Sequence, residues 1–257
     1  MSGKKISRRR FLGLGGAILA GTALLPAFGA ALLPPGGGGQ SVRYGMVVDW
    51  RRLTAEDIAR MSRACHEGHN VPAVTEPGHE VKWLWGESFD RVFPEWEAPY
   101  AEDPRALSLP VLCNHCESPP CCRVCPTEAT FKRADGVVMM DYHRCIGCRF
   151  CMAACPYGAR SFNFTDPRRY LDEIRGDYPT RALGVVEKCD FCEERLRLGL
   201  EPLCAEASGG AVVFGDLADP DSAPRRLLAA NFSLRRKAEL GTGPNVHYLW
   251  RGVEADA

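Results

Sequence analysis

The chain has 257 residues and equal numbers of basic and acidic side chains, 32 of each. That length suits one large domain or two small ones, and a net charge of zero gives no electrostatic reason to expect nucleic acid as a partner. The thirteen cysteines are the strongest compositional feature. Because their number is odd, disulfide bonds cannot account for all of them.

The first 31 residues have the pattern of an export signal. A basic head precedes a long apolar run that starts at Phe11, and "SRRRFLG" at residues 7–13 matches the twin-arginine export pattern. An uncleaved membrane anchor is the alternative, because the run is long enough to span a bilayer. Residues 32–41 are predicted to be a flexible linker. We therefore expect residues 42–257 to form an exported domain on the periplasmic side of the cytoplasmic membrane.

Two features precede the main cysteine groups. His66 and His69 flank an isolated cysteine, Cys65, and are expected to be ordinary polar loop residues. Hydrogen-bond donors to a cluster, or ligands to a partner's haem, are the alternatives. The following segment is rich in aromatic side chains, namely Trp83, Trp85, Phe89, Phe93 and Trp96. Two roles stay open for them: a docking face for a partner protein, or a cover that keeps solvent away from a metal site.

Short helices and strands are predicted around the cysteine groups. Strands are predicted in the two arms of a hairpin that turns at Asp135-Gly136, in residues 158–164 and in residues 245–250. Helices are predicted over residues 193–200, with Gly199 as the stop, and over residues 219–232, with Asp221 or Ser222 as the N-cap. These elements indicate a small α+β fold organised around metal centres rather than around a large apolar core.

The cysteines form three groups. These are Cys113, Cys116, Cys121 and Cys125; Cys145, Cys148, Cys151 and Cys155; and Cys189, Cys192 and Cys204. The second group has the C-x2-C-x2-C-x3-C-P spacing of bacterial ferredoxins, in which three thiolates on one loop bind a cluster and the fourth reaches a different cluster. Zinc is the alternative, but a single tetrahedral ion typically uses two separated pairs. For Cys189 and Cys192 alone, zinc would be an equal alternative.

These groups resemble the four-cluster ferredoxin-like subunits of membrane oxidoreductases, such as the electron-transfer subunits of dimethyl sulfoxide, polysulfide and nitrite reductases. The resemblance covers roughly residues 42 to 250. It implies tandem bacterial-ferredoxin-like repeats, with an inner pair at about 105–165 and an outer pair formed by 42–75 and 180–216. In that family each cluster takes three cysteines from one group and the fourth from its partner group.

Carried over to this sequence, the resemblance implies three [4Fe–4S] clusters. Site one would use Cys113, Cys116, Cys121 and Cys155; site two Cys145, Cys148, Cys151 and Cys125; and site three Cys189, Cys192, Cys204 and Cys65. The last group has Ser208 where its fourth cysteine should be, and the first group keeps only Cys65. All four missing ligands would then belong to one cluster, so the sequence indicates that the fourth cluster site has been lost as a unit. A [3Fe–4S] centre at the Cys189 group and iron ligation by Ser208 are the alternatives.

Two residues within the groups have no assigned ligand role. Cys122, beside Cys121, is spare and is expected to be a packing residue. His115 lies between two of the expected ligands. It could hydrogen-bond a sulfur, which would tune a reduction potential, or it could be an exposed histidine.

Within the family, the sequence most resembles the exported iron–sulfur subunit of the Dsr complex, a transmembrane assembly that serves dissimilatory sulfite reductase. The stretches "ACHEGHNVP", "GVVMMDYHRCIGCRFCMAACPYGARSFNF" and "EASGGAVVFGDL" carry this resemblance. It implies an electron-transfer subunit without a substrate site of its own. Its partners in a hetero-oligomeric membrane complex would be a quinone-interacting integral membrane subunit and a cytochrome c.

Two other functions stay open. One is an electron-transfer subunit of a molybdopterin oxidoreductase, for example in polysulfide or tetrathionate reduction. The other is a binding module that uses metal only for stability. The sequence shows no nucleophile–base constellation, and its glycine runs lie in the expected signal and linker, so no dinucleotide or phosphate loop is predicted.

Overall fold

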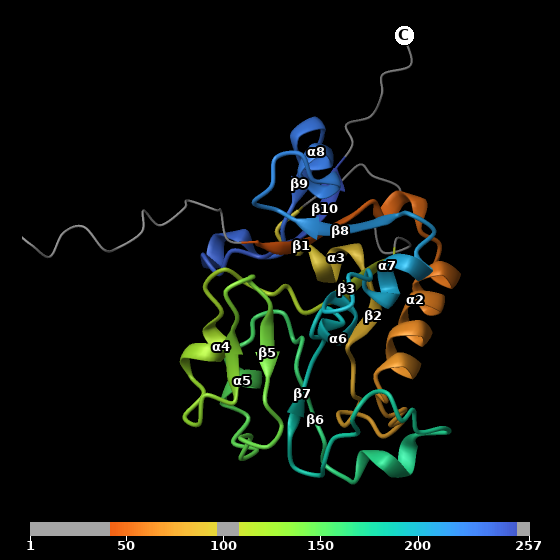
Figure 1. Ribbon diagram of the computed structural model, residues 1–257, viewed down its shortest axis with the longest axis vertical. Coiled ribbons are helices and arrows are strands. Elements are labelled where there is room, and N and C mark those ends of the chain that lie inside the picture. The colour runs from red at the N-terminus through yellow and green to blue at the C-terminus, as the bar shows by residue number, and fades with distance from the viewer. Residues whose placement is uncertain (1–41, 97–107, 251–257) are drawn as a thin grey trace, which may run out of the picture. The chain divides into compact units, whose positions relative to one another are not determined.

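The computed structural model of the protein describes residues 42–96 and 108–250 (Figure 1). The expected export signal at residues 1–31 and the linker at residues 32–41 lie outside the described residues. Within the described ranges, no helix is both long enough and apolar enough to cross a membrane. All described residues belong to one compact unit, Gln40–Ala257.

A four-stranded mixed sheet brings together the two ends of the described chain. Its strand order is β8 (Val212–Asp216), β1 (Tyr44–Val48), β10 (Val246–Trp250) and β9 (Phe232–Leu234). Strand β1 runs antiparallel to β8 and parallel to β10, with Met46 opposite both Phe214 and Val246. The apolar run of β1 is buried almost throughout, as expected for an inner strand. The strand predicted over residues 245–250 is thereby confirmed as β10.

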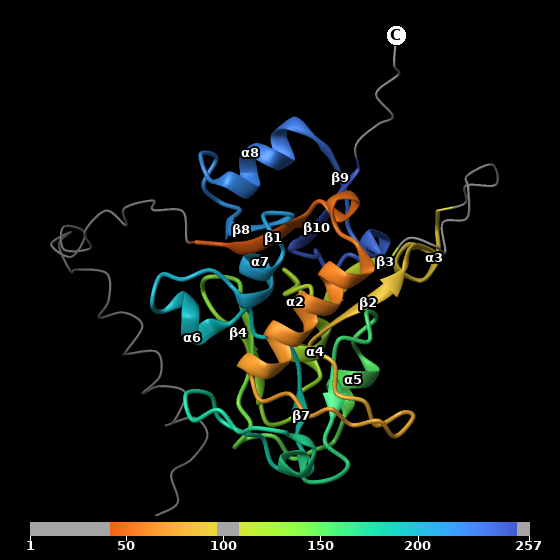
Figure 2. The same ribbon diagram turned by 90° about the vertical axis from the view of Figure 1, so that its right-hand side faces the viewer.

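Helix α2 (Ala55–Gly68) is the longest helix in the described part of the chain and was not predicted. It begins with a capping box, in which the Thr54 hydroxyl accepts from the Asp57 amide and the Asp57 carboxylate accepts from the Thr54 amide. Its buried residues are Ile58, Met61 and Cys65, whose spacing of three and four places them on one face. This face packs against β2 and α7 (Figure 2).

Three two-stranded antiparallel sheets complete the strands. They are β2 (Leu84–Ser88) with β3 (Ser108–Leu112), β4 (Thr130–Lys132) with β5 (Val138–Met140), and β6 (Ser161–Phe162) with β7 (Val186–Glu187). The hairpin predicted to turn at Asp135-Gly136 is confirmed as β4–β5, and Gly136 has the positive φ that such a turn needs. The strand predicted in residues 158–164 is confirmed as β6.

Short helices lie in or beside the cysteine groups. They are α4 (Pro120–Arg123), α5 (Phe150–Ala153), α6 (Glu193–Leu196) and α7 (Leu203–Ala207). The other helices are η1 (Trp50–Arg52), α3 (Phe89–Val92), η3 (Pro167–Tyr170), α8 (Ala223–Ala230) and η4 (Ala238–Leu240). The predicted N-cap of α8 is Ser222, whose hydroxyl accepts from the Arg225 amide. The helix predicted over residues 193–200 is shorter, because it ends at Leu196 before Gly199 turns the chain.

The apolar core is larger than the sequence pattern predicts. It extends from the four-stranded sheet through α2 to the β2–β3 pair. Trp83, Phe89 and Phe93 are buried in it, so these three aromatic side chains do not form a docking face. Trp96, from the same aromatic segment, is exposed. The core is larger because the four-stranded sheet, α2 and the β2–β3 pair contribute apolar residues of their own, and Cys65, Cys189 and Cys204 are buried among them.

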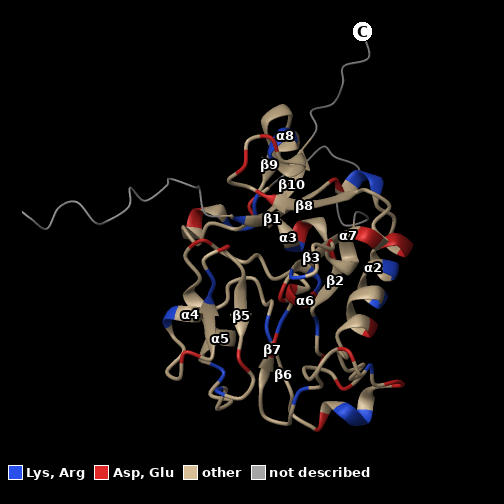
Figure 3. Ribbon diagram, viewed as in Figure 1, with Lys and Arg blue, Asp and Glu red and all other residues tan. Residues whose placement is uncertain are grey.

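Charged residues of both signs are spread over the described surface (Figure 3). On α2 both signs occur on the side that faces solvent, where Glu56, Arg60, Arg63 and Glu67 are exposed. Arg60 forms an ion pair with Asp57 and donates to the Ala207 carbonyl of α7. This mixture agrees with the net charge of zero and gives no single-sign field for nucleic acid.

Candidate metal centres

All thirteen cysteines lie in the described residues, and all are free thiols. The absence of disulfides removes one explanation for so many cysteines. Metal ligation is the other explanation, and the sequence predicts it for twelve of them.

Site one is a pocket between two cysteine groups. Cys113, Cys116 and Cys121 from the first group line it together with Cys155 from the second. Arg160 and the ring of Tyr157 also line the pocket. The structure thus brings together the four cysteines expected at site one. In the sequence, the whole β4–β5 hairpin lies between Cys121 and Cys155.

Asn114 tests whether this pocket suits an iron–sulfur cluster. Its side chain lines the pocket and is 1% exposed. Neither its amide nitrogen nor its oxygen has a hydrogen-bond partner among the described residues. A buried amide donor without a partner is costly, and sulfur atoms inside the pocket are acceptors that would satisfy it. The donor set of four thiols and one free amide therefore fits an iron–sulfur cluster.

Site two lies nearer the surface. Cys125, Cys145 and Cys151 pack in one apolar cluster with Val138 and Val186. Cys148 lies on the same loop as Cys145 and Cys151 and is half-buried.

The loop of site two is tightly folded against the neighbouring chain. At Gly147 a Cβ atom would stand 2.4 Å from the carbonyl oxygen of Gly184. Its φ of 71° also belongs to the left-handed region. The loop leaves Ile146 and Phe150 exposed on either side of Cys148, with Ile146 66% exposed. Only glycine therefore allows the close approach that this cysteine loop makes.

Site three is the most deeply buried. Cys65 of α2 lies in the main apolar core with Cys189 and Cys204. Cys192 is also buried, and its Sγ accepts a hydrogen bond from the Leu203 amide at 3.4 Å. The Cys189 Sγ accepts from the Phe191 amide at 3.5 Å. Backbone donors directed at ligand sulfurs are one means by which proteins tune iron–sulfur centres.

Burial changes the acidity of these thiols. It raises the pKa of Cys116 and of Cys204 to about 12, and burial also raises the pKa of Cys65, where Cys189 and Cys204 add to the effect. At neutral pH such thiols are protonated in the polypeptide alone. Because metals bind the thiolate, metal binding would release these protons.

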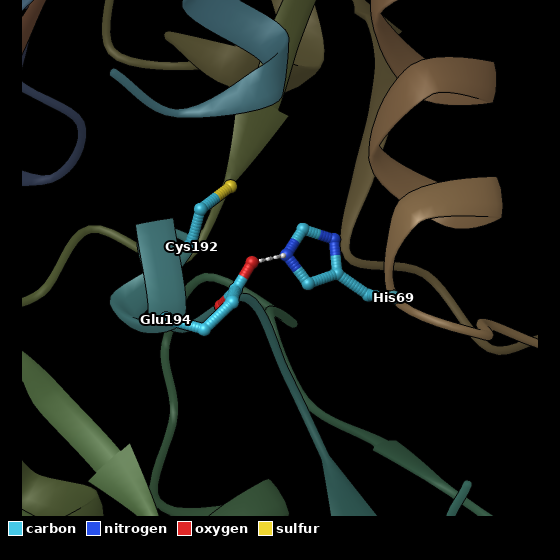
Figure 4. A group of neighbouring side chains, drawn as sticks. All are labelled: His69, Cys192 and Glu194. Atoms are coloured by element: carbon cyan, nitrogen blue, oxygen red, sulfur yellow. Dashed lines mark ion pairs between the residues drawn. The ribbon is translucent and has the colours of Figure 1, made fainter. Parts of the chain in front are cut away.

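His69 closes one side of site three (Figure 4). Its Nδ1 donates to the Cys65 carbonyl at 2.6 Å, and its Nε2 lies 3.2 Å from Glu194 Oε1. Burial alone would lower the pKa of His69, but the hydrogen bond to Glu194 and the charge of Asp190 outweigh it, so this pKa is raised. The expectation of an ordinary polar loop histidine is wrong, because His69 is fully buried against Trp83.

His69 also lies close to Cys192, one of the cysteines expected at site three. The ligand atoms of His69, Cys192 and Glu194 lie within 4.8 Å of one another. This trio could hold a single ion, but it would use Cys192, which is one of the four cysteines gathered at site three. Asp190 holds the same loop, because its carboxylate accepts from the Cys192 amide at 2.9 Å and from the Tyr178 hydroxyl at 2.7 Å.

His115 lies between sites one and three. It is fully buried, so the interpretation as an exposed histidine is wrong. Its Nδ1 accepts from the Val138 amide at 3.0 Å, and its ring stacks on Phe191 at 3.6 Å. Burial, with Lys188 and Arg160 nearby, holds the pKa of His115 well below its usual value and keeps the ring neutral.

Several known proteins are similar to this chain. A family model described as a 4Fe-4S dicluster domain matches residues 105–167. The Hdr-like menaquinol oxidoreductase iron–sulfur subunit 1 of Archaeoglobus fulgidus is 41% identical over 97% of this chain and 100% of its own length. An iron–sulfur subunit named for dimethyl sulfoxide reductase in Halobacterium salinarum is 39% identical over 80% of this chain and 78% of its own. A tetrathionate reductase subunit of Salmonella typhimurium is 34% identical over 95% and 88%.

The chain belongs to this family of iron–sulfur subunits. It is an electron-transfer subunit rather than a catalytic one, and its fold is a mixed α and β fold with a ferredoxin-like 4Fe-4S domain. The resemblance to dimethyl sulfoxide reductase subunits is confirmed, whereas a special closeness to the Dsr branch stays a prediction.

In this iron–sulfur subunit Ser208 has a structural role. Its hydroxyl donates to the Ala205 carbonyl at 2.7 Å and accepts from the Val212 amide at 2.9 Å. These bonds connect α7 to β8, and they already satisfy the hydroxyl. The geometry therefore gives no support to iron ligation by Ser208.

Helix α2 occupies the segment where the first cysteine group would lie. Ferredoxin spacing counted back from Cys65 falls on Met61, Ile58 and Ala55. Ile58 and Met61 are buried in the core instead of lining a ligand loop. A regular helix has thus replaced the loop, which sequence patterns could have shown through the apolar residues at i, i+3 and i+7 after the capping pair Thr54 and Asp57.

Proposed function

We propose that this subunit carries three [4Fe–4S] clusters and passes electrons within a membrane-associated complex of sulfur metabolism. The observation that carries the proposal is the pocket of site one, where Cys155 of one group joins three cysteines of another. Such exchange of the fourth ligand between groups is typical of two-cluster ferredoxin units. When bound, each cluster supplies one-electron redox chemistry, and the protein supplies ligands, burial and spacing.

The contacts between sites support a linear order of three, one and two. Cys113 of site one packs against the core that contains Cys189 of site three. Cys121 of site one lies in the same apolar cluster as Cys151 of site two. We propose site one as the middle position, with site three at the end where a fourth cluster is missing.

The proposed partners follow from the relatives and from the expected export signal. One relative is named for a menaquinol oxidoreductase, so we propose a quinone-interacting integral membrane subunit as one partner. A cytochrome c subunit is proposed as the other. The twin-arginine pattern supports assembly on the periplasmic side of the cytoplasmic membrane. Electrons would pass between the membrane subunit or cytochrome and the other subunits.

A second function is favoured by a specific comparison. The tetrathionate reductase subunit of Salmonella typhimurium is 34% identical over 95% of this chain. The protein could therefore serve a molybdopterin oxidoreductase. Co-purification separates the two: molybdenum with a large catalytic subunit would support this alternative, whereas haem c with a membrane quinone subunit would support the first proposal.

Iron and sulfide analysis of anaerobically purified protein tests the cluster number. Three [4Fe–4S] centres give about twelve irons per chain, four in each centre. A content near eight or sixteen would contradict the ligand assignment. Iron–sulfur clusters would give a brown protein whose broad visible absorption is bleached by dithionite. A colourless protein would instead indicate a binding module stabilised by a different metal.

A further inference from the structure

Buried cations are unusually free of acidic partners in this protein. Among the described residues, the buried Lys and Arg side chains are Arg160, Arg181, Lys188 and Arg236. Arg181 has a carboxylate partner, Glu187, and no ion pair joins the other three to an acidic side chain within the described ranges. A buried charge without a counter-charge is strongly unfavourable. For Arg160, the nearest source of negative charge is the group of cysteine sulfurs in the same pocket and the cluster that they would bind.

Arg160 has the clearest position of the three. It is 5% exposed and lines the pocket of site one. Its Nη2 donates to the Thr130 hydroxyl at 2.6 Å, and its Nη1 lies 3.8 Å from the Met140 sulfur. Both partners are neutral, so they orient the guanidinium without compensating its charge. They also hold it beside the β4–β5 hairpin, between the two cysteine groups.

Cysteines of two sites lie near this guanidinium. Cys113 and Cys121 of site one line the same pocket as Arg160. Cys151 of site two packs in one apolar cluster with Cys121 and with Met140, whose sulfur lies next to Arg160. The nearby cysteine sulfurs favour the charged guanidinium more than burial disfavours it, so the pKa of Arg160 is raised. Arginine is charged at every relevant pH in any case, so its positive charge is a fixed feature of both sites.

We propose that Arg160 is the shared counter-charge of sites one and two and that it raises the reduction potentials of both clusters. The inference rests on the proposed function, because it requires clusters at both sites. Uptake of an electron adds one negative charge to a site, and a fixed cation in a water-poor interior favours the more negative state. Arg160 is thus a tuning residue, which lines the pocket of site one and contacts Met140 of the apolar cluster that contains Cys151 of site two.

The test is a redox titration of the purified holoprotein and of Arg160→Gln, followed by electron paramagnetic resonance. In the variant, two of the three one-electron potentials should fall. The expected change is at least about tenfold in the reduction equilibrium, which corresponds to about 59 mV for one electron. The reduction equilibrium of the third centre, assigned to site three, should change by less than about twofold, because Arg160 lines the pocket of site one and contacts Thr130 and Met140 of the β4–β5 hairpin.

Arg144→Gln is the matched control. Arg144 directly precedes Cys145 of site two, but its side chain is 51% exposed. The effect of an exposed charge is screened by water and salt. The reduction equilibria of all three centres should therefore stay within about twofold of the wild-type values. Equal shifts in Arg144→Gln and Arg160→Gln would overturn the inference, since net charge rather than buried position would then be responsible.

The remaining outcomes are also decisive. If Arg160→Gln loses iron from two sites, Arg160→Lys is compared. Full iron and potentials near the wild type in Arg160→Lys support a role of the charge, whereas loss of iron there too overturns it. Unchanged potentials in a fully loaded Arg160→Gln overturn the inference while leaving the proposed function intact. Wild-type protein without clusters at sites one and two overturns both.

Discussion

Arg181 and Glu187 form an ion pair in which neither side chain has any exposure to solvent, with Arg181 Nη2 2.6 Å from Glu187 Oε2. Arg181 also donates to the carbonyls of His69 and Asn70. Glu187 accepts from the Trp83 indole at 2.9 Å. The pair therefore connects the turn that follows Cys65 with strand β7, which leads into Cys189. It holds together the two segments that supply site three.

Glu187→Gln tests this connection. The change leaves the Arg181 charge buried without a partner, so we expect a loss of about 3–5 kcal/mol in the free energy of unfolding, measured by anaerobic urea denaturation. About a third of the iron should be lost, because site three is one of three equal centres. Glu239→Gln, at an exposed position, is the control. A loss below about 1 kcal/mol would show that the pair is not required.

Replacing single cysteines tests the ligand assignment. Cys65→Ser should alter site three alone, with loss of up to four irons or conversion to a three-iron centre with its own electron paramagnetic resonance signal. Cys122→Ser should leave the iron content unchanged, because Cys122 lies beside Cys121 but does not line the pocket of site one. Equal iron loss in both variants would contradict the assignment.

Ser208→Ala separates a structural serine from a metal ligand. The Val212 amide would lose its acceptor, so stability should fall by about 1–3 kcal/mol, as seen in the urea midpoint. Iron content and all three potentials should stay at wild-type values. Ser118→Ala, at an exposed position, should change neither stability nor iron. A change of the iron signals in Ser208→Ala would instead restore Ser208 as a ligand candidate.

Asn114→Leu tests the amide that faces site one. Removal of a hydrogen-bond donor from a cluster lowers its reduction potential. We expect one of the three potentials to fall while the other two remain, as measured by redox titration. Asn231 bonds to the Leu227 carbonyl on α8, away from the cysteine groups, so Asn231→Leu is the control. Three unchanged potentials in Asn114→Leu would show that its amide does not reach the cluster.

His247 predicts a pH dependence of stability. Burial, with the charges of Arg235 and Arg43, lowers the pKa of His247 to about 4. His247 takes up a proton at a higher pH in the unfolded chain than in the folded one. The contribution of neutral His247 to the free energy of unfolding is therefore complete above about pH 6.5 and is lost as pH falls toward 4. Over this window the cost is up to about 3 kcal/mol. His247→Gln should reduce the fall in urea midpoint between pH 7.5 and 5, and His143→Gln, at an exposed position, should not.

Cys155 lies in one pocket with Cys113, Cys116 and Cys121, as the pairing rule of the family implied and as no local pattern could. The three ligand sets stay predictions, but the cysteine groups themselves could be recognised because cysteine spacing is a local property. Gly136 and Ser222 marked a turn and a helix start for the same local reason. Such signals depend on neighbours in the chain and survive in any tertiary context.

The buried polar residues could not be predicted, because they depend on contacts between distant segments. Arg160, His115 and Glu187 look like ordinary polar residues in the sequence, yet all three are buried. Their burial follows from the way the β4–β5 hairpin and β7 meet. Helix α2 differs, because its signal is local: Ile58, Met61 and Cys65 have the spacing of one buried helix face after the capping pair Thr54 and Asp57.

The position of Cys65 on α2 also sets an order in the making of the protein. Residues 113–155 contain every proposed ligand of sites one and two, so with these ligand sets a nascent chain could complete both before β7 is synthesised. Site three needs Cys65 from the early part of the chain and Cys204 from the late part. Its completion therefore reports that α2, β7 and α7 have all been made and have met. With the proposed ligand set, a loaded site three marks a chain that has been synthesised at least through α7.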